Sequence, residues 1–92
     1  MDLRQALASA LKTIRSARGL TQEDFSNVSS RTYLSTLERG LKSPTLDKMQ
    51  VLAEVLDVHP VTVMALTFIT AENSSADELL AKVKLELRAL GH

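Results

Sequence analysis

The residues with the clearest binding chemistry lie in one short segment between Ser29 and Gly40. Its leucines, Leu34 and Leu37, are three residues apart and would share the inward side of a short helix. The remaining side would carry hydroxyl and guanidinium groups, from Arg31, Thr32, Ser35 and Thr36. A helix with small polar and basic groups on its outer side suits insertion into the major groove of DNA, which is about 12 Å wide and admits one α-helix.

Capping residues and glycines divide the chain into helices that would position this segment. Asp2 can cap the first helix and Gly19 can end it, while Thr21 with Asp24 resembles a capping box. Ser29 and Ser30 can each cap the next helix, and Thr45 can cap the one after it. We expect helices over residues 2–18, 22–27, 31–39, 46–56, 60–69 and 76–90.

Apolar residues at helical spacing predict the inward faces of these helices. In the segment 46–56 the apolar stripe comprises Leu46, Met49, Leu52, Ala53 and Leu56. In the segment 60–69 the expected buried side comprises Val61, Met64, Ala65 and Phe68. Residues 70–74 have the composition of a linker, and Ser75 with Glu78 forms a second capping box. Strand-type alternation is absent, so the predicted fold class is all-α.

The composition argues against an enzyme and against a metal site. The chain has no cysteine, its two histidines, His59 and His92, are far apart, and its carboxylates fall mainly on exposed helical faces or beside basic residues. We therefore expect no catalytic residues and no cofactor. The first residues lack the apolar core of a signal peptide, which favours the cytoplasm. The most apolar run, 61–69, is about half the length of a membrane span, so we expect no membrane association.

Charge is unevenly distributed although the formal net charge is zero. Residues 1–45 contain seven basic and four acidic side chains, a net charge of +3, and residues 46–92 carry −3. Because the field near a surface depends on local charge, the first half could present a basic face to phosphate while the acidic half points away. A chance asymmetry on an ordinary solvated surface is the alternative.

Three motifs in order give the sequence a specific resemblance. They are Gly19-Leu20-Thr21-Gln22-Glu23, Ser30-Arg31-Thr32-Tyr33-Leu34-Ser35-Thr36-Leu37-Glu38-Arg39-Gly40 and Ser43-Pro44-Thr45-Leu46. In this spacing they resemble the Cro/phage-repressor (XRE-type) helix-turn-helix family over roughly residues 3–69. The resemblance implies a five-helix DNA-binding domain at 1–70, to which residues 71–92 would add a linker and a C-terminal amphipathic helix.

The resemblance also implies roles for individual residues. Gln22 would bond a phosphate and help to hold a side chain of the helix 31–39, and Ser30 would contact the DNA backbone. Base edges would be read by Arg31, Thr32, Ser35 and Thr36. Arg39, Lys42 and Ser43 would contact the backbone phosphates of the other DNA strand. Arg15 and Glu38 would form an ion pair that orients the reading helix without touching bases.

One departure from the family lies in the turn. The stretch from Gln22 through Arg39 holds 18 residues, two fewer than is usual, and its turn Ser26-Asn27-Val28-Ser29 contains no glycine. The turn must therefore be tighter than in most members of the family, and the aim of the reading helix could differ.

The C-terminal segment predicts a dimer interface. Ala76, Leu80, Val83, Leu87 and Leu90 recur at spacings of four and three, the pattern of a coiled-coil seam, and Leu79 widens it. A homodimer would place two reading helices on paired half-sites of a palindromic operator. The alternative is that this helix folds back over its own domain.

The sequence predicts a DNA-binding transcriptional regulator, most simply a repressor, with double-stranded DNA as its partner. An antitoxin with a toxin partner, a restriction-modification controller, and a helical protein-interaction module without DNA binding are the alternatives. The sequence does not choose the operator, the regulatory sign, or any effector.

Overall fold

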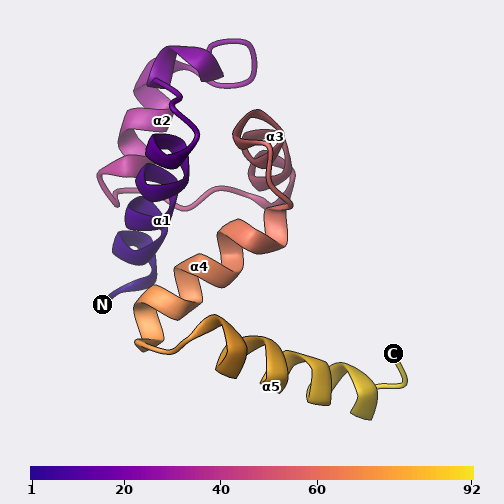
Figure 1. Cartoon of the computed structure of the whole chain (residues 1–92). Helices are drawn as coiled ribbons and strands as arrows, with labels where there is room; N and C mark the ends of the chain where they lie inside the picture. Colours follow the sequence, from indigo (N-terminus) through magenta and orange to yellow (C-terminus); the bar gives the residue numbers. More distant parts are fainter.

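A computed structural model describes the whole chain from Met1 to His92 and contains helices but no strands. The elements in chain order are α1 (Leu3–Ala17), the 3-10 helix η1 (Gln22–Phe25), α2 (Arg31–Glu38), α3 (Leu46–Leu56), α4 (Pro60–Glu72) and α5 (Ala76–Ala89). Figure 1 shows α1 and α2 side by side, with α3 facing them and α4 running below towards α5. The predicted all-α class is confirmed. The chain has the five helical segments that the resemblance implied and one further helix at the C-terminus.

Side-chain caps begin these helices where the sequence predicts them. The carboxylate of Asp2 accepts from the backbone N–H of Arg4 at 2.7 Å, and the Ser30 hydroxyl accepts from that of Tyr33 at 3.0 Å. The hydroxyl of Thr45 accepts from Lys48 N at 3.1 Å. Each cap satisfies a backbone donor that a helix N-terminus leaves without a partner.

Gly40 ends α2 under two separate constraints. Its φ of 73° lies in the left-handed region, where side chains are strained. A Cβ at this position would also lie 2.6 Å from Nε2 of Gln5 on α1. Glycine therefore allows the end of α2 to approach α1 closely.

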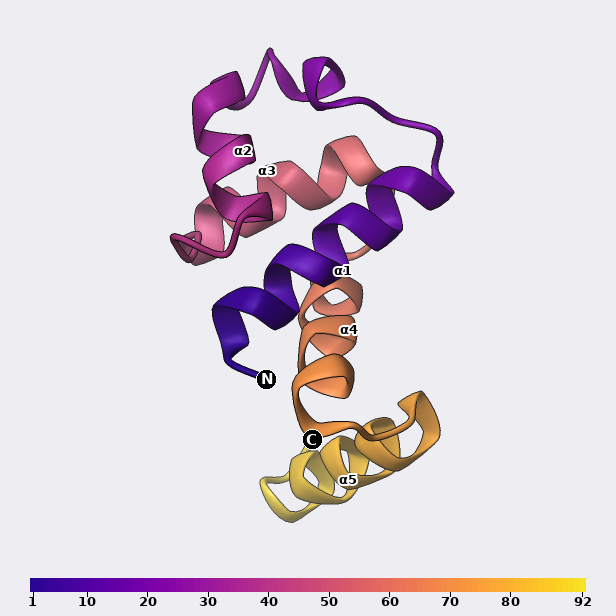
Figure 2. The same ribbon diagram turned by 90° about the vertical axis from the view of Figure 1, so that its left-hand side faces the viewer.

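One core joins α1, η1, α2, α3 and α4. Its largest fully buried side chains are Phe25, Leu11, Leu34, Leu37, Leu52, Leu56 and Val63. Figure 2 shows α1 lying in front of α3, with α4 extending from below them towards α5. The inward direction predicted for Leu34 and Leu37 is confirmed, which leaves the other side of α2 free.

The predicted buried face of α4 is wrong. The structure buries Val63 and Thr67, whereas Val61, Met64 and Phe68 are exposed. The Thr67 hydroxyl is accommodated because it donates to the Val63 carbonyl at 2.8 Å. Since α4 carries apolar residues on nearly all sides, helical spacing alone did not identify its inward side. Leu46 was also expected in the core, but its side chain is 77% exposed at the start of α3.

The junction between α4 and α5 is shorter than the predicted linker. Residues 70–72 belong to α4, which ends at Asn73 in the left-handed conformation with φ of 53°. Only Asn73, Ser74 and Ser75 separate the two helices, and the predicted Ser75–Glu78 capping box opens α5.

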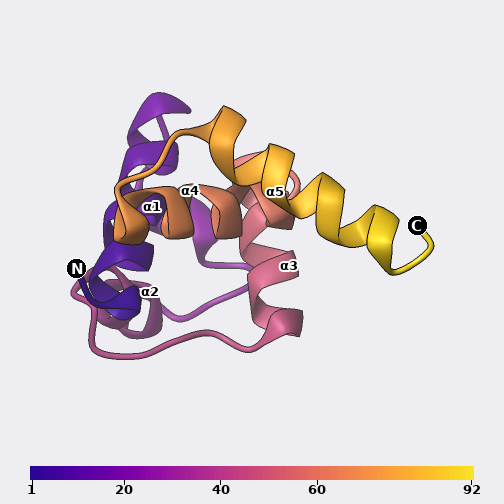
Figure 3. The same cartoon turned by 90° about the horizontal axis from the view of Figure 1, so that it is seen from below.

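No residue of α5 is buried. Figure 3 shows this helix running along the outside of α4 and past α3, with the C-terminus beyond the body of the molecule. In this structure the C-terminal helix therefore covers little of its own domain. Contact with α4 is restricted to the start of α5, where Ala76 and Leu80 line a groove with α4 residues.

No single helix is long and apolar enough to span a membrane. Only α3 and α4 taken together have the required length and composition, and the chain bends by 101° between them.

Two leucines of α3 test this account of the core. Leu52→Ala should lower the free energy of unfolding by about 2–5 kcal/mol, because it leaves a cavity among fully buried side chains. The matched control, Leu46→Ala, should change stability by less than about 0.5 kcal/mol because the side chain is exposed. Urea denaturation measures both, and a comparable loss in the two variants would contradict the assignment of Leu46 to the surface.

Candidate nucleic-acid interface

The shortened sequence between Gln22 and Arg39 is accommodated in the first helix and the turn. Helix η1 is a single 3-10 turn of four residues, and residues 26–29 connect it to α2. Asp24 holds the start of η1 by accepting from the Thr21 backbone N–H at 2.7 Å. Phe25 at its end is buried and ties η1 to the core. The two-residue shortening is thus compatible with a helix-turn-helix.

A bidentate ion pair connects α1 to the end of α2. Arg15 Nε donates to Glu38 Oε2 at 2.8 Å and Nη2 donates to Oε1 at 3.0 Å, in the parallel geometry that suits guanidinium and carboxylate. Arg15 Nη1 also donates to the Leu20 carbonyl at 3.1 Å. The Arg15–Glu38 contact that the resemblance implied is therefore present, with the Glu38 side chain 3% exposed.

The hydrogen bonds that Arg15 donates to Glu38 raise the pKa of Arg15, against the opposing effect of burial. A cation whose pKa is raised on folding contributes stability at every pH below its ordinary range and loses it only above. Arg15 therefore stays charged at all pH values used for DNA binding.

Gln22 completes this cluster from η1. Its Nε2 donates to Glu38 Oε1 at 3.1 Å, so the amide holds a side chain of α2, as the resemblance implied. Three elements, α1, η1 and α2, consequently meet at one carboxylate. The contact of Gln22 with a phosphate stays a prediction.

Lys48 supports the turn from α3, a role that the sequence analysis missed. Its Nζ donates to the Val28 carbonyl at 2.7 Å and lies 5.2 Å from the centre of the Tyr33 ring. The charge thus fixes a backbone carbonyl of the turn and packs over an aromatic face at the start of α2. No pattern near Lys48 signals this contact, because its partners are distant in the sequence.

The outer side of α2 is open to solvent. Arg31 and Thr32 are exposed, Ser35 and Thr36 are half-buried, and Thr36 Oγ1 donates to the Thr32 carbonyl at 2.7 Å. The nearest charge to Arg31 is Glu23, with Nη1 and Oε1 3.7 Å apart and both side chains 75% exposed. Such an exposed pair is weak, so Arg31 can exchange Glu23 for a ligand.

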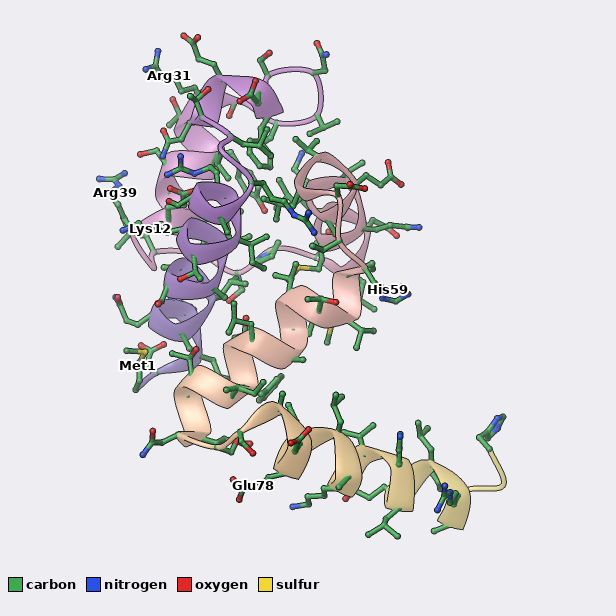
Figure 4. All side chains as sticks on the ribbon, in the orientation of Figure 1. Met1, Lys12, Arg31, Arg39, His59 and Glu78 are labelled. Carbon is green, nitrogen blue, oxygen red and sulfur yellow. The ribbon has the colours of Figure 1, made fainter.

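Further basic and polar groups flank α2. The Ser30 hydroxyl accepts a backbone hydrogen bond as a cap and retains its own hydrogen for donation. Beyond the end of α2, Arg39, Lys42 and Ser43 are exposed. Figure 4 shows Arg31, Arg39 and Lys12 on one side of the molecule, although Lys12 was not among the predicted site residues.

No group of three or more histidine, cysteine, aspartate or glutamate side chains is arranged to hold a metal ion.

Comparison with known proteins identifies the family. The family model described as helix-turn-helix matches residues 11–63, which is more than half of the chain and includes η1 and α2. The chain belongs to this helix-turn-helix family. Its branch is the Cro/phage-repressor type, and the members are DNA-binding transcriptional regulators and not enzymes.

Individual relatives span most of this helix-turn-helix protein. The uncharacterized HTH-type transcriptional regulator y4dJ of Sinorhizobium fredii is 39% identical over 69 residues, 73% of this chain and 90% of that protein. Control protein C.SmaI of Serratia marcescens is 32% identical over 59 residues, 62% of this chain and 70% of its own.

Two solved structures are similar in fold. The clp gene regulator ClgR of Corynebacterium glutamicum is 30% identical, with a TM-score of 0.73 and 90% of each chain covered. The restriction-modification controller protein C.Esp1396I is 26% identical, with a TM-score of 0.67, and covers 77% of this chain and 94% of its own. The helix-turn-helix arrangement therefore matches that of a clp gene regulator and of a restriction-modification controller.

Mutation of the Arg15–Glu38 pair should expose its contribution to stability. Either Arg15→Met or Glu38→Leu should cost about 3–5 kcal/mol, because each variant leaves the other charge without its partner. Arg15→Met should be the costlier of the two, since the Glu38 side chain that it strands is 3% exposed and that of Arg15 is 20% exposed. The double variant should recover part of the loss. Chemical denaturation measures each variant. Glu23→Ala removes an exposed pair and should cost less than about 1 kcal/mol. A fully additive double variant would show that the two groups do not stabilise each other.

Proposed function

We propose that this regulator inserts α2 into the major groove of a two-fold symmetric operator and acts as a repressor. The observation that carries the proposal is the outer side of α2, which presents Arg31 and Thr32 to solvent while its inner side is fixed by Leu34, Leu37 and Glu38. A rigid helix with an unoccupied polar face can enter the groove without rearrangement. Repression requires only that the bound protein occlude a promoter.

Direct readout would come from Arg31, Thr32, Ser35 and Thr36. Arg31 at the start of α2 can donate two hydrogen bonds to O6 and N7 of one guanine. Thr32 offers a hydroxyl and a methyl group, the latter suited to the thymine methyl. Thr36 donates its hydroxyl hydrogen to the helix backbone, so towards a base it would serve as an acceptor or an apolar contact.

Phosphate contacts would flank the groove. Gln22 and Ser30 would contact one strand near the free backbone N–H groups at the start of α2, which favour anions. The other strand would meet Arg39, Lys42 and Ser43. The net charge of +3 within residues 1–45 supports this orientation although the whole chain is neutral.

The regulator would bind as a homodimer. One helix-turn-helix makes few base contacts, and paired half-sites about one DNA turn apart mirror the symmetry of a dimer. The seam along α5 and its C-cap comprises the half-buried Leu79 and the exposed Leu80, Val83, Leu87 and Leu90. Together with the exposed apolar side of α4, it supplies candidate interface area.

Two substitutions separate base readout from phosphate binding. Arg31→Ala should weaken binding to the specific site by about 1–3 kcal/mol and relax preference at one base position. Lys42→Ala should weaken all sequences alike and reduce the salt dependence by about one unit of slope. Fluorescence anisotropy at several salt concentrations measures both, with Lys82→Ala on α5 as the basic control. Parent-like operator affinity of Arg31→Ala would remove it from the readout.

Control of restriction-modification genes is the second candidate. It is favoured by the similarity to C.SmaI and C.Esp1396I, which are named as controller proteins, and by the coverage of 94% of the latter chain. Footprinting on the DNA around the gene would test it. Protection upstream of adjacent endonuclease or methyltransferase genes would support this role, and protection only at unrelated promoters would contradict it.

A further inference from the structure

The exposed surfaces of α1 and α2 carry no carboxylate. No residue of α1 is acidic, and the single acidic residue of α2, Glu38, is buried. By contrast, α3 has exposed carboxylates at Asp47 and Glu54, and α5 begins with exposed Asp77 and Glu78. A surface without fixed negative charge suits a polyanion such as the DNA backbone, because nothing on it repels the phosphates.

Two contacts hold the end of α2 against α1. Arg15 binds Glu38, and the Gln5 amide lies so close to Gly40 that a Cβ there would be 2.6 Å from Nε2. Lys12 lies on α1 between these two points, three residues before Arg15, and residues at this spacing are neighbours on one side of a helix. The Lys12 side chain therefore flanks the end of α2.

The side of α1 that borders α2 carries exposed hydrogen-bond donors. Gln5, Ser9 and Lys12 are exposed and recur at spacings of four and three, so they form one row, which we call the α1 edge. Lys12 takes part in neither ion pair of the chain. The nearest exposed carboxylates in the sequence, Asp2 and Glu23, lie in the cap of α1 and in η1 and not in this row. The α1 edge thus offers one cation, one amide and one hydroxyl to a ligand.

The α1 edge lies where a phosphate strand would run if α2 occupied the major groove. An α-helix with its side chains is about 10–12 Å across, so it fills a groove that is about 12 Å wide. The axis of a second helix packed against it lies about 8–10 Å away, which places that helix at the rim of the groove, beside the phosphates. The contacts of Arg15 and Gln5 give α1 this position relative to α2.

We propose that the α1 edge is a further DNA-binding surface, in which Lys12 forms an ion pair with a backbone phosphate and Gln5 and Ser9 donate hydrogen bonds to the same strand. The inference rests on the proposed insertion of α2 into the groove. Figure 4 shows Lys12 on the same side of the molecule as Arg39, so the two cations would hold one strand from two helical elements. A phosphate contact positions the protein and carries no sequence information of its own.

Charge changes at Lys12 test this surface. Lys12→Ala should weaken binding to specific and random duplexes alike, by about threefold, and should lower the slope of log affinity against log salt concentration by about 0.9, the value for one lost phosphate contact. Lys12→Glu should weaken binding by about tenfold or more, because it places like charges together. The matched control Lys82→Glu on α5 changes the net charge equally and should leave affinity within about twofold, since salt screens distant charges. Fluorescence anisotropy at several salt concentrations measures all three.

Two results of this series would overturn the α1 edge. One is a Lys12→Ala protein with the affinity and salt slope of the parent. The other is an equal loss in Lys12→Glu and Lys82→Glu, which would reflect net charge and not a local contact. Both lysines are exposed, so thermal unfolding should show the Tm of the parent for every variant and separate lost contact from lost folding.

Chemical protection gives a second test, because the natural chain contains no cysteine. The thiol of Ser9→Cys should lose most of its reactivity towards an alkylating agent when duplex DNA is bound. Glu54→Cys on α3 is the control, since this exposed position carries a carboxylate that disfavours phosphate, and it should react equally with and without DNA. An unprotected Ser9→Cys thiol at saturating DNA would overturn the proposal.

These measurements separate the inference from the proposed function. A salt slope that depends on Lys12, in a protein whose Arg31→Ala variant selects the same sequences as the parent, would support the α1 edge and contradict the readout. A parent-like Lys12→Ala protein beside a weakened Arg31→Ala protein would overturn the α1 edge and leave the readout standing.

Discussion

The arrangement of the DNA-binding face depends on one buried carboxylate. Glu38 is the last residue of α2, where the negative end of the helix dipole disfavours an anion, and its side chain is almost completely buried. Without a cation it would be costly to place there. Arg15 supplies the charge with two hydrogen bonds, and Gln22 adds a third from η1. The same contacts therefore neutralise the carboxylate and fix α2 relative to α1 and η1.

The short helix α2 has an inner side that packs against the core and an outer side that is open to solvent. Leu34, Leu37 and Glu38 hold its inner side, while Arg31 and Thr32 on the outer side are exposed to solvent. The tight turn before it is supported from α3 by Lys48, which binds the Val28 carbonyl. A turn without glycine can thus keep its position because a long side chain from another helix secures its backbone.

The sequence was sufficient to predict the features that depend on local signals. Caps at Asp2, Ser30, Thr45 and Ser75 defined helix starts, and the spacing of Leu34 and Leu37 defined the inner side of α2. Family resemblance, and not periodicity, led to the Arg15–Glu38 contact.

Features set by tertiary packing were not predictable in this way. The inward side of α4 was misassigned because an apolar residue on nearly every side leaves no periodic signal, and burial is then decided by neighbouring helices. Lys48 was missed because its partner is 20 residues away. The path of α5 away from the body also could not be predicted, since a seam of this kind suits either its own domain or a second copy.

Selection of bound sequences from random duplex DNA by the full chain tests whether α2 reads a two-fold symmetric operator. We predict an enriched consensus made of two inverted half-sites about one DNA turn apart, each with a guanine that Arg31 can read. Recovery of unselected sequence, or of a single half-site without symmetry, would contradict it.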